Sequence, residues 1–131
     1  MNVAEALAGR MIGPRDGDFV IAEWSDAGGG SDPPLYIAPL HVHHADDEAW
    51  YVLEGALRFH VDDEEIDAPA GAAVFVPSGT PHAYWNPSPE PARYLLVMTP
   101  RVARLIEALH STPGDRQAYE AIFREHASEL L

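Results

Sequence analysis

The stretch HVHHADDEAWYVLEG, residues 41–55, concentrates histidines and acidic side chains where a strand would ordinarily carry apolar ones. Residues two apart on a strand face the same side, so the rings of His41 and His43 share one face and Val42 takes the other. Glu48 follows after a short loop, which brings it back beside the two rings on the next strand. Imidazole and carboxylate groups are ligands for divalent first-row metals. The His-x-His pair alone leaves two interpretations open, because a strand histidine is more often an ordinary hydrogen-bonded residue.

The residues around this stretch read as a series of short strands. Runs rich in β-branched and aromatic residues alternate with turns that contain glycine, proline or paired acidic residues, which is typical of an all-β sandwich or barrel. The predicted strands are residues 19–24, 35–43, 48–54, 56–61, 64–68, 72–77, 81–86 and 93–99.

After Pro100 the apolar residues recur at helical spacing instead. Thr112 is predicted as a helix N-cap, with Pro113 in the first position and Asp115 in the first turn. We expect these helices to pack on the outside of the barrel or against a second subunit, without a catalytic role. Their apolar stripes are Val102, Leu105, Ile106 and Leu109, then Tyr119, Ile122, Phe123 and Leu130.

Length and composition limit the classes of protein to consider. The 131 residues predict one domain, with a barrel core at about 19–99 and a helical tail at about 100–131. The absence of cysteine excludes disulfides and thiolate metal sites and fits a reducing, cytoplasmic location. Eight basic and 21 acidic residues give a net charge of −13, which disfavours nucleic acid and anionic membranes as partners. We expect neither a signal peptide nor a membrane span, which needs roughly 20 apolar residues.

The spacing of the histidines, glycines and prolines carries more information than any single motif. His41-x-His43, four residues, Glu48, six residues and Gly55 are followed later by Gly71, five residues, Pro77-x-Gly79, two residues, His82, three residues and Asn86. This pattern resembles the two-part signature of the cupin superfamily, with every signature position filled. In general look the chain is similar to small single-domain bacterial proteins called quercetin-dioxygenase-like cupins.

The resemblance implies a fold, a metal site and an assembly. The expected fold is all-β: a cupin jelly-roll β-barrel with a C-terminal helical extension. His41, His43, Glu48 and His82 are expected to converge inside it on one divalent transition metal, which could be iron, manganese, nickel or zinc. Asn86 is expected to satisfy backbone groups of a loop, and a homodimer is expected, with the N-terminal strand or the tail helices at the contact.

Other residues near the signature receive more ordinary interpretations. Asp46 and Asp47 are expected to form a solvated loop tip, and His44 to point away from the metal. Trp50 and Val52 share the strand face of Glu48, and Tyr84 shares that of His82, so these three are candidates for the wall of a substrate pocket, with core packing as the alternative. Surface or packing roles are expected for the three remaining histidines, His60, His110 and His126.

The ligand set suggests a reaction class without fixing it. Four protein ligands on an octahedral metal leave two positions open, as in working rather than structural sites. The function expected first is a mononuclear metal-dependent dioxygenase of a small organic substrate. The alternatives are a redox-neutral isomerase or polyketide-type cyclase, and a non-catalytic small-molecule-binding protein. Glu48 is the one candidate catalytic residue, as a base that would leave the metal.

Overall fold

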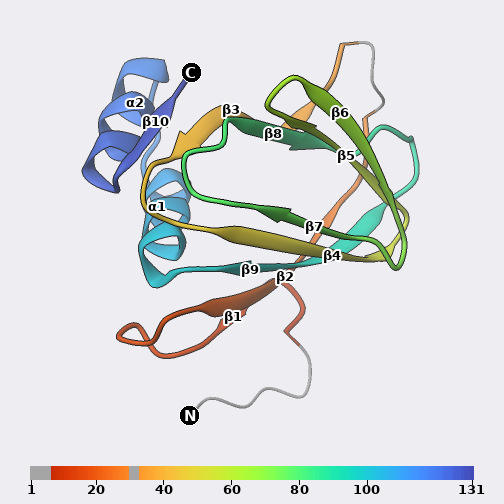
Figure 1. Ribbon diagram of the computed structural model, residues 1–131, viewed down its shortest axis with the longest axis horizontal. Helices are drawn as coiled ribbons and strands as arrows, with labels where there is room; N and C mark the ends of the chain where they lie inside the picture. Colours follow the sequence, from red (N-terminus) through yellow and green to blue (C-terminus); the bar gives the residue numbers. More distant parts are fainter. Residues whose placement is uncertain (1–6, 30–32) are drawn as a thin grey trace.

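The computed structural model describes residues 7–29 and 33–131 and consists of two antiparallel sheets that face each other, with two helices at one end (Figure 1). The strand order is β1-β2-β9-β4-β7 in one sheet and β10-β3-β8-β5-β6 in the other. The elements in chain order are β1 (Met11–Ile12), β2 (Val20–Asp26), β3 (Tyr36–His43), β4 (Glu48–Glu54), β5 (Ala56–Val61), β6 (Glu64–Pro69), β7 (Ala73–Val76), β8 (His82–Trp85), β9 (Ala92–Met98), α1 (Pro100–Ser111), α2 (Arg116–Glu125) and β10 (Ser128–Leu130).

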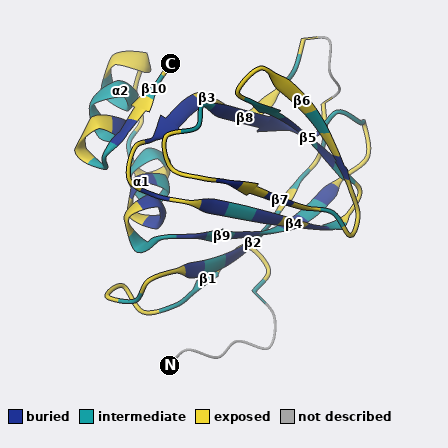
Figure 2. Cartoon of the chain, viewed as in Figure 1, coloured by how far each residue is buried: buried dark blue, intermediate teal, exposed yellow. Residues whose placement is uncertain are grey.

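This arrangement confirms the all-β jelly-roll prediction, and each of the eight predicted strands corresponds to an observed one. The alternation of the sequence explains why. Every second residue of β9, from Ala92 to Met98, is buried between the sheets, and the residues between them are only partly buried (Figure 2). In β4 the side chains of Glu48, Trp50 and Val52 face inward in the same way. A one-residue slip would turn each of these inner faces outward, so burial fixes the register.

The turn at Gly55 shows why the signature contains a glycine. Its φ is +72°, in the left-handed region, and a Cβ there would lie 2.5 Å from the carbonyl oxygen of Pro91. Both the conformation and the space therefore require glycine. Asn86 has the expected structural role: its Nδ2 donates to the Glu90 carbonyl at 2.7 Å, and its Oδ1 accepts from the Ser88 N–H at 3.0 Å.

The helical tail differs from its prediction in where the elements begin and end. Asp115, not Thr112, is the N-cap of the second helix, α2: its side chain accepts from the Ala118 N–H at 3.0 Å. Thr112 is instead the C-cap of α1, and the N-cap of α1 is Thr99, whose hydroxyl accepts from the Val102 N–H at 3.2 Å. The Pro113-Gly114 pair therefore separates two helices.

The chain also forms two short strands that were not predicted, β1 and β10. The expected place of Leu130 in a helical stripe is wrong, because α2 ends at Glu125 and Leu130 lies in β10. Ala127, with φ of 53°, turns the chain from helix to strand. β10 then pairs antiparallel with β3, with Ser128 opposite His43 and Leu130 opposite His41. The last residues of the chain thus lie directly beside the histidine pair.

The helices do not pack only on the outside of the barrel. They cover one end of the space between the sheets, where Val102 and Leu105 of α1 are buried and Phe123 of α2 faces the same interior (Figure 1). Their apolar side chains line a partly open cavity together with strand residues. Neither helix in the described part of the chain has the length and apolar character needed to cross a membrane.

Candidate metal centre and cavity

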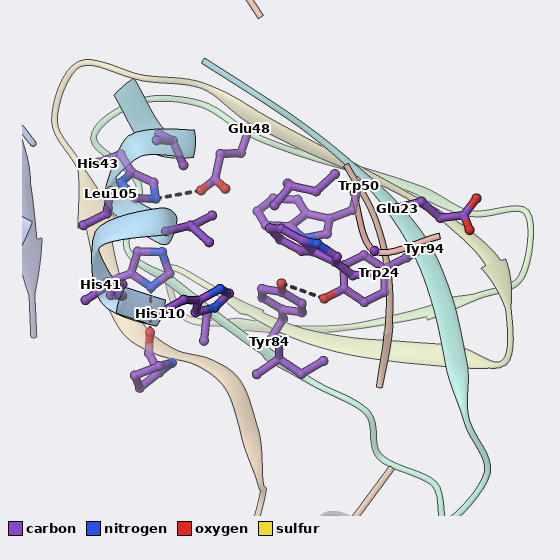
Figure 3. A pocket seen from close by; sticks show the side chains of 18 of the residues that line it. Glu23, Trp24, His41, His43, Glu48, Trp50, Tyr84, Tyr94, Leu105 and His110 are labelled. Atoms are coloured by element: carbon purple, nitrogen blue, oxygen red, sulfur yellow. Dashed lines mark hydrogen bonds and ion pairs between the residues drawn. The ribbon is translucent and has the colours of Figure 1, made fainter. Parts of the chain in front are cut away.

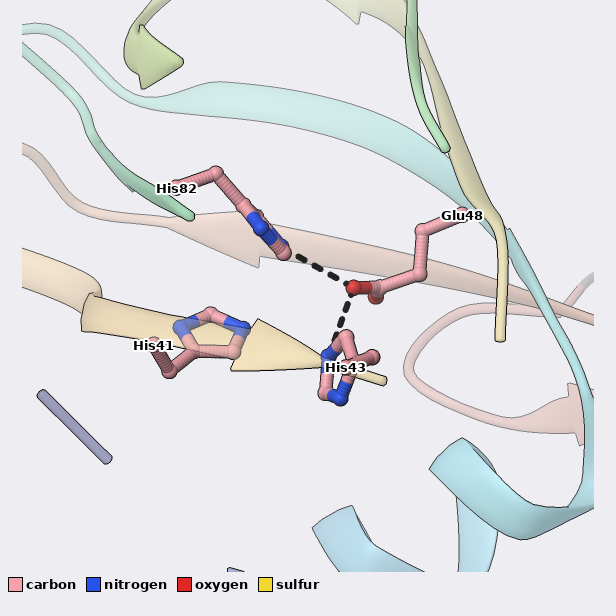
Figure 4. Close-up of side chains that lie close together, drawn as sticks. All are labelled: His41, His43, Glu48 and His82. Carbon is pink, nitrogen blue, oxygen red and sulfur yellow. Dashed lines mark hydrogen bonds and ion pairs between the residues drawn. The ribbon is translucent and has the colours of Figure 1, made fainter. Parts of the chain in front are cut away.

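Four side chains from three strands converge at one point inside the barrel (Figure 4). His41 and His43 lie at the end of β3, Glu48 begins β4, and His82 begins β8. The antiparallel register places His41 directly opposite His82. All four residues are between 1% and 5% exposed, and their potential ligand atoms lie within 4.8 Å of one another. Groups that lie far apart in the chain are thus positioned to hold a metal ion.

The carboxylate lies between two imidazoles. Glu48 Oε1 is 2.8 Å from His43 Nε2 and 3.1 Å from His82 Nε2. The ring of His41 completes the group, with its centroid 4.7 Å from that of His43 and 4.2 Å from that of His82.

The other nitrogen of each ring is held by the surrounding chain. His41 Nδ1 is 2.6 Å from the Pro39 carbonyl oxygen, and His82 Nδ1 is 2.9 Å from that of Thr80. A carbonyl only accepts, so both Nδ1 atoms donate. His43 Nδ1 lies 2.7 Å from Ser128 Oγ, whose own hydrogen is donated to the His126 carbonyl at 3.0 Å. His43 Nδ1 must therefore donate as well, and each neutral ring presents the lone pair of Nε2 to the cluster.

The positions of the ring protons show whether the three histidines and Glu48 suit a cation. The Nε2 lone pairs of His43 and His82 point at a carboxylate oxygen, which is repulsive unless a proton or a metal ion lies between them. Three neutral imidazoles and one carboxylate, each imidazole oriented by a hydrogen bond on its far side, form a donor set for a divalent first-row metal. The four residues fit such an ion.

The buried environment keeps both kinds of ligand in the form that a metal requires. Burial by itself would raise the pKa of Glu48, but the hydrogen bonds that form when a proton lies between its Oε1 and the Nε2 atoms of His43 and His82 outweigh burial and bring the pKa down to about 2. Burial, reinforced by the neighbouring His82 and His43, lowers the pKa of His41 to about 3. At neutral pH the carboxyl is thus ionised and His41 is uncharged.

The acidic residues before Glu48 differ from each other in a way that was not predicted. Asp46 is buried, which corrects the expectation of a solvated loop tip. Its Oδ1 accepts from the Thr99 hydroxyl at 3.0 Å, and its Oδ2 is 3.6 Å from Arg101 Nε, so it supports the start of α1. Asp47 is exposed and accepts from the Ser78 N–H. His44 is exposed, as expected, and lies 3.6 Å from Glu129.

A cavity of about 970 Å³ borders the four-residue group (Figure 3). Two of the three candidate pocket residues, Trp50 and Tyr84, line this cavity. Val52 lies in the hydrophobic core and is not among the lining residues. His110, expected at the surface or in packing, also lines the cavity, with its ring 6.5 Å from that of Trp24.

Other lining residues were not predicted from the sequence to face a pocket. Tyr94 is one, although its inward direction follows from the alternation of residues 92–98 and could have been found. Phe123 is another; its ring lies 5.6 Å from that of His41, and only the packing of α2 reveals this contact. The lining is mainly apolar, and Arg93 is its only lysine or arginine within the described ranges. Arg93 forms ion pairs with Glu23 at 3.2 Å and Glu54 at 3.0 Å.

Comparison with known proteins agrees with the fold. The sequence model of the cupin domain matches residues 28–98, more than half of the chain. An uncharacterized protein of Methanocaldococcus jannaschii is 31% identical over 61 residues, which are 47% of this chain and 49% of that protein. The chain therefore spans about half the length of this curated relative.

Solved structures show the same likeness. An uncharacterized protein with a double-stranded β-helix domain from Klebsiella pneumoniae is 26% identical, with a TM-score of 0.53 over 63% of this chain and 68% of the other. A sugar phosphate isomerase of the cupin superfamily from Silicibacter pomeroyi is also 26% identical, with a TM-score of 0.55 over 63% of this chain and 51% of the other. Together with the two opposed sheets and the buried histidine–glutamate group, the match over residues 28–98 shows that the chain belongs to the cupin family.

Proposed function

We propose that this protein is a mononuclear metal-dependent dioxygenase that acts on a small, largely apolar organic compound. The observation that carries the proposal is the contact between the two sites: His41, His43 and Glu48 belong both to the four-residue group and to the wall of the cavity. A compound in the cavity would therefore lie directly beside the metal ligands.

The roles of the four residues follow from their hydrogen bonds. His41, His43, Glu48 and His82 would hold one divalent metal, which could be iron, manganese, nickel or zinc. A redox-active ion such as iron(II), when bound, would supply the activation of dioxygen and of the organic substrate. The Nδ1 hydrogen bonds keep the rings oriented before any ion arrives. Where a proton lies between Glu48 and each of the two neighbouring imidazoles, the pKa of Glu48 is about 2, because these hydrogen bonds outweigh its burial. Glu48 is a weak base while they hold it, and it serves as a proton acceptor only when released.

The chemistry of the cavity indicates the class of substrate. Aromatic and aliphatic side chains such as Trp24, Leu96 and Ile106 form most of the wall, which favours a compound that buries apolar rings. Arg93 is already paired with two carboxylates, Glu23 and Glu54, and the chain as a whole carries a net charge of −13. A phosphorylated or otherwise anionic substrate would find little compensation here.

A second candidate is a redox-neutral isomerase or a polyketide-type cyclase that uses the same metal as a Lewis acid. Its support is the likeness to the sugar phosphate isomerase from Silicibacter pomeroyi, of which this chain covers about half. The single paired arginine of the cavity argues against a sugar phosphate as the substrate. An uncharged diketone or polyketide-like compound suits the apolar wall better.

Oxygen consumption by metal-loaded protein tests the first candidate against the second. The protein is loaded separately with iron(II), manganese(II), nickel(II) and zinc(II) and mixed with catechols and β-diketones. We expect uptake of dioxygen with a redox-active metal, none with His82→Ala, and unchanged uptake with His44→Ala, because His44 is exposed and outside the group. No uptake in any combination would overturn the dioxygenase proposal, and product formation under strict anaerobiosis would favour the redox-neutral enzyme.

We also propose that the protein is a homodimer that associates through the outer face of the β1-β2-β9-β4-β7 sheet. Two exposed aromatic residues of this face support the idea: Phe75 is 63% exposed and Tyr51 45% exposed. They lie on β7 and β4 beside the uncharged Ala49 and Val97, which the strand register places in one row with Phe75. A like copy suits this uncharged row better than the rest of an acidic surface does. Light scattering after gel filtration should give twice the chain mass for the wild type and the single mass for Phe75→Glu; a wild-type monomer would refute the proposal.

A further inference from the structure

A row of aromatic rings leads from the metal ligands across the cavity. The ring of Trp50 lies 5.8 Å from that of His82 and 5.3 Å from that of Tyr84, and the ring of Tyr84 lies 5.8 Å from that of Tyr94. Figure 3 shows Tyr84 and Tyr94 on the opposite side of the cavity from His43 and Glu48. The three residues Trp50, Tyr84 and Tyr94 carry polar atoms, one indole nitrogen and two phenol oxygens, that do not belong to the four-residue group of metal ligands.

These polar atoms contain more hydrogen donors than acceptors. The Trp50 indole N–H and the two phenol O–H groups supply three hydrogens, and only the two phenol oxygens can accept among themselves. The hydroxyls of Tyr84 and Tyr94 are 3.1 Å apart, and a hydroxyl pair shares one hydrogen bond. Even if the indole also donated to a phenol oxygen, one hydrogen would stay without an acceptor within the trio.

The indole nitrogen is the clearest case. Trp50 is 2% exposed, and its Nε1 is buried without a hydrogen-bond partner among the residues that the structure describes. The indole lies near enough to the Tyr84 hydroxyl to affect its pKa, but the two groups do not meet the geometry of a hydrogen bond. Leaving a buried donor without an acceptor costs free energy, so this part of the cavity wall favours a partner that brings an acceptor.

We propose that Trp50, Tyr84 and Tyr94 form a subsite that binds an uncharged acceptor oxygen, a carbonyl or an ether, on an otherwise apolar ring compound. The subsite defines the substrate class of the proposed enzyme. It rests on the proposed function for the orientation of the compound: the end that reacts lies beside the metal ligands, and the acceptor oxygen lies beside the two phenols. Binding of the oxygen is a property of the cavity and does not need the metal.

The charges around the cavity favour an uncharged acceptor over an anion. The wall contains the carboxylate of Glu48, and its one arginine within the described ranges, Arg93, is paired with Glu23 and Glu54. An anionic group would therefore find no unpaired lysine or arginine in the wall to compensate its charge. The surplus of donors also disfavours an amine or a second hydroxyl in place of the oxygen, because either would bring another hydrogen without an acceptor.

Two probes that differ by one oxygen test the proposal. 1-Tetralone and tetralin share the same fused rings, and only the first carries a carbonyl, which cannot chelate a metal by itself. Their affinities are measured by calorimetry for the metal-free and the zinc-loaded protein. We expect 1-tetralone to bind about 10-fold more tightly than tetralin in both forms, which is the scale of one net hydrogen bond. In the double variant Tyr84→Phe/Tyr94→Phe this ratio should fall below about threefold, with melting measurements showing that the variant is folded.

The ratio of the two affinities separates recognition from packing, because a change in cavity shape weakens both probes alike. Tyr51→Phe is the matched control: it removes an exposed phenol on the outer face of β4 and should keep the wild-type ratio. Equal affinities of the two probes for the wild type, no binding of either, or an unchanged ratio in the double variant would each overturn the subsite. None of these results depends on oxygen uptake, so a failure of the subsite and a failure of the proposed dioxygenase can be told apart.

Discussion

The two polar sides of the cavity are supported by the surrounding chain in opposite ways. At the histidine side, the Nδ1 atom of each imidazole in the cluster has an acceptor: the Pro39 carbonyl, the Thr80 carbonyl and the Ser128 hydroxyl. At the tyrosine side, Trp50 Nε1 has none within the described part of the chain, and the two phenols share one hydrogen bond. The first side is complete apart from a cation, whereas the second becomes complete only with a ligand that brings an acceptor.

The histidine side must be ordered by folding, whereas the tyrosine side can be completed by the bound ligand. Orientation of the imidazoles has to be fixed in advance, because a metal site that is loose by a fraction of an ångström loses affinity. Unsatisfied donors, in contrast, can be left for the substrate, and they then discriminate against compounds that lack the oxygen. Changes at each side should accordingly affect different measurements.

The largest effect is expected from removing a metal ligand. His82→Ala leaves three ligands, and metal content should fall from about one ion per chain to near zero after dialysis, a larger loss than the roughly 10- to 100-fold typical of changes around the ligands. Elemental analysis of protein purified without added metal measures it. His44→Ala is the control, because His44 neighbours the cluster in sequence but is exposed. Full metal content in His82→Ala would show that the histidine side is not the binding site.

The second-largest effect is expected from a residue that both lines the cavity and contacts the histidine cluster. Phe123 packs against His41 from α2, and Phe123→Ala should lower the free energy of unfolding by about 3 kcal/mol, the lower end for such truncations because one side of the ring faces the cavity. Leu35→Ala, at an exposed position outside the proposed dimer face, should change it by less than about 0.5 kcal/mol. Denaturant unfolding compares the two. Equal effects would mean that α2 does not close the cavity as described.

Much of the histidine side could be predicted from the sequence, because the direction of its side chains follows from the spacing of residues that are close together in the chain. A spacing of two on a strand puts His41 and His43 on one face, and the same period identified Trp50 and Tyr84 as inward residues. The period does not tell how deep a position lies, so Val52 shares the face of Trp50 but belongs to the core. Asp46 escaped prediction since its partner, Thr99, lies 53 residues away.

The end of the chain shows the limit most clearly. The apolar spacing of α2 continues past its last turn, so nothing in the sequence marks the change to a three-residue strand at Ser128. Only the pairing with β3 places the Ser128 hydroxyl beside His43. A residue that fixes the orientation of a metal ligand was therefore invisible to any argument from spacing.

Ser128 provides the test of how much that orientation contributes. Ser128→Ala removes the acceptor of His43 Nδ1, and the affinity for zinc should fall by roughly 10- to 100-fold while the fold is kept. Competition with a chromophoric chelator measures the affinity. Ser111→Ala is the matched control, because its hydroxyl donates to the Glu107 carbonyl on the exposed side of α1. An unchanged zinc affinity in Ser128→Ala would show that the far-side hydrogen bond of His43 is dispensable.

The smallest effect is expected at the tyrosine side, where a buried phenol titrates late. Burial raises the pKa of Tyr94 to about 12 from its ordinary value of 10. A raised folded-state pKa gives stability that is complete below pH 10 and is lost as the pH rises through 12. At pH 11 the phenol of the folded protein is still mainly protonated, while that of the unfolded chain is mainly ionised, a difference of about 1 kcal/mol. Tyr94→Phe should therefore lose less stability than the wild type between pH 9 and pH 11. Parallel loss in the two proteins would mean that Tyr94 is not in the dry, donor-rich environment that separates this side of the cavity from the histidine side.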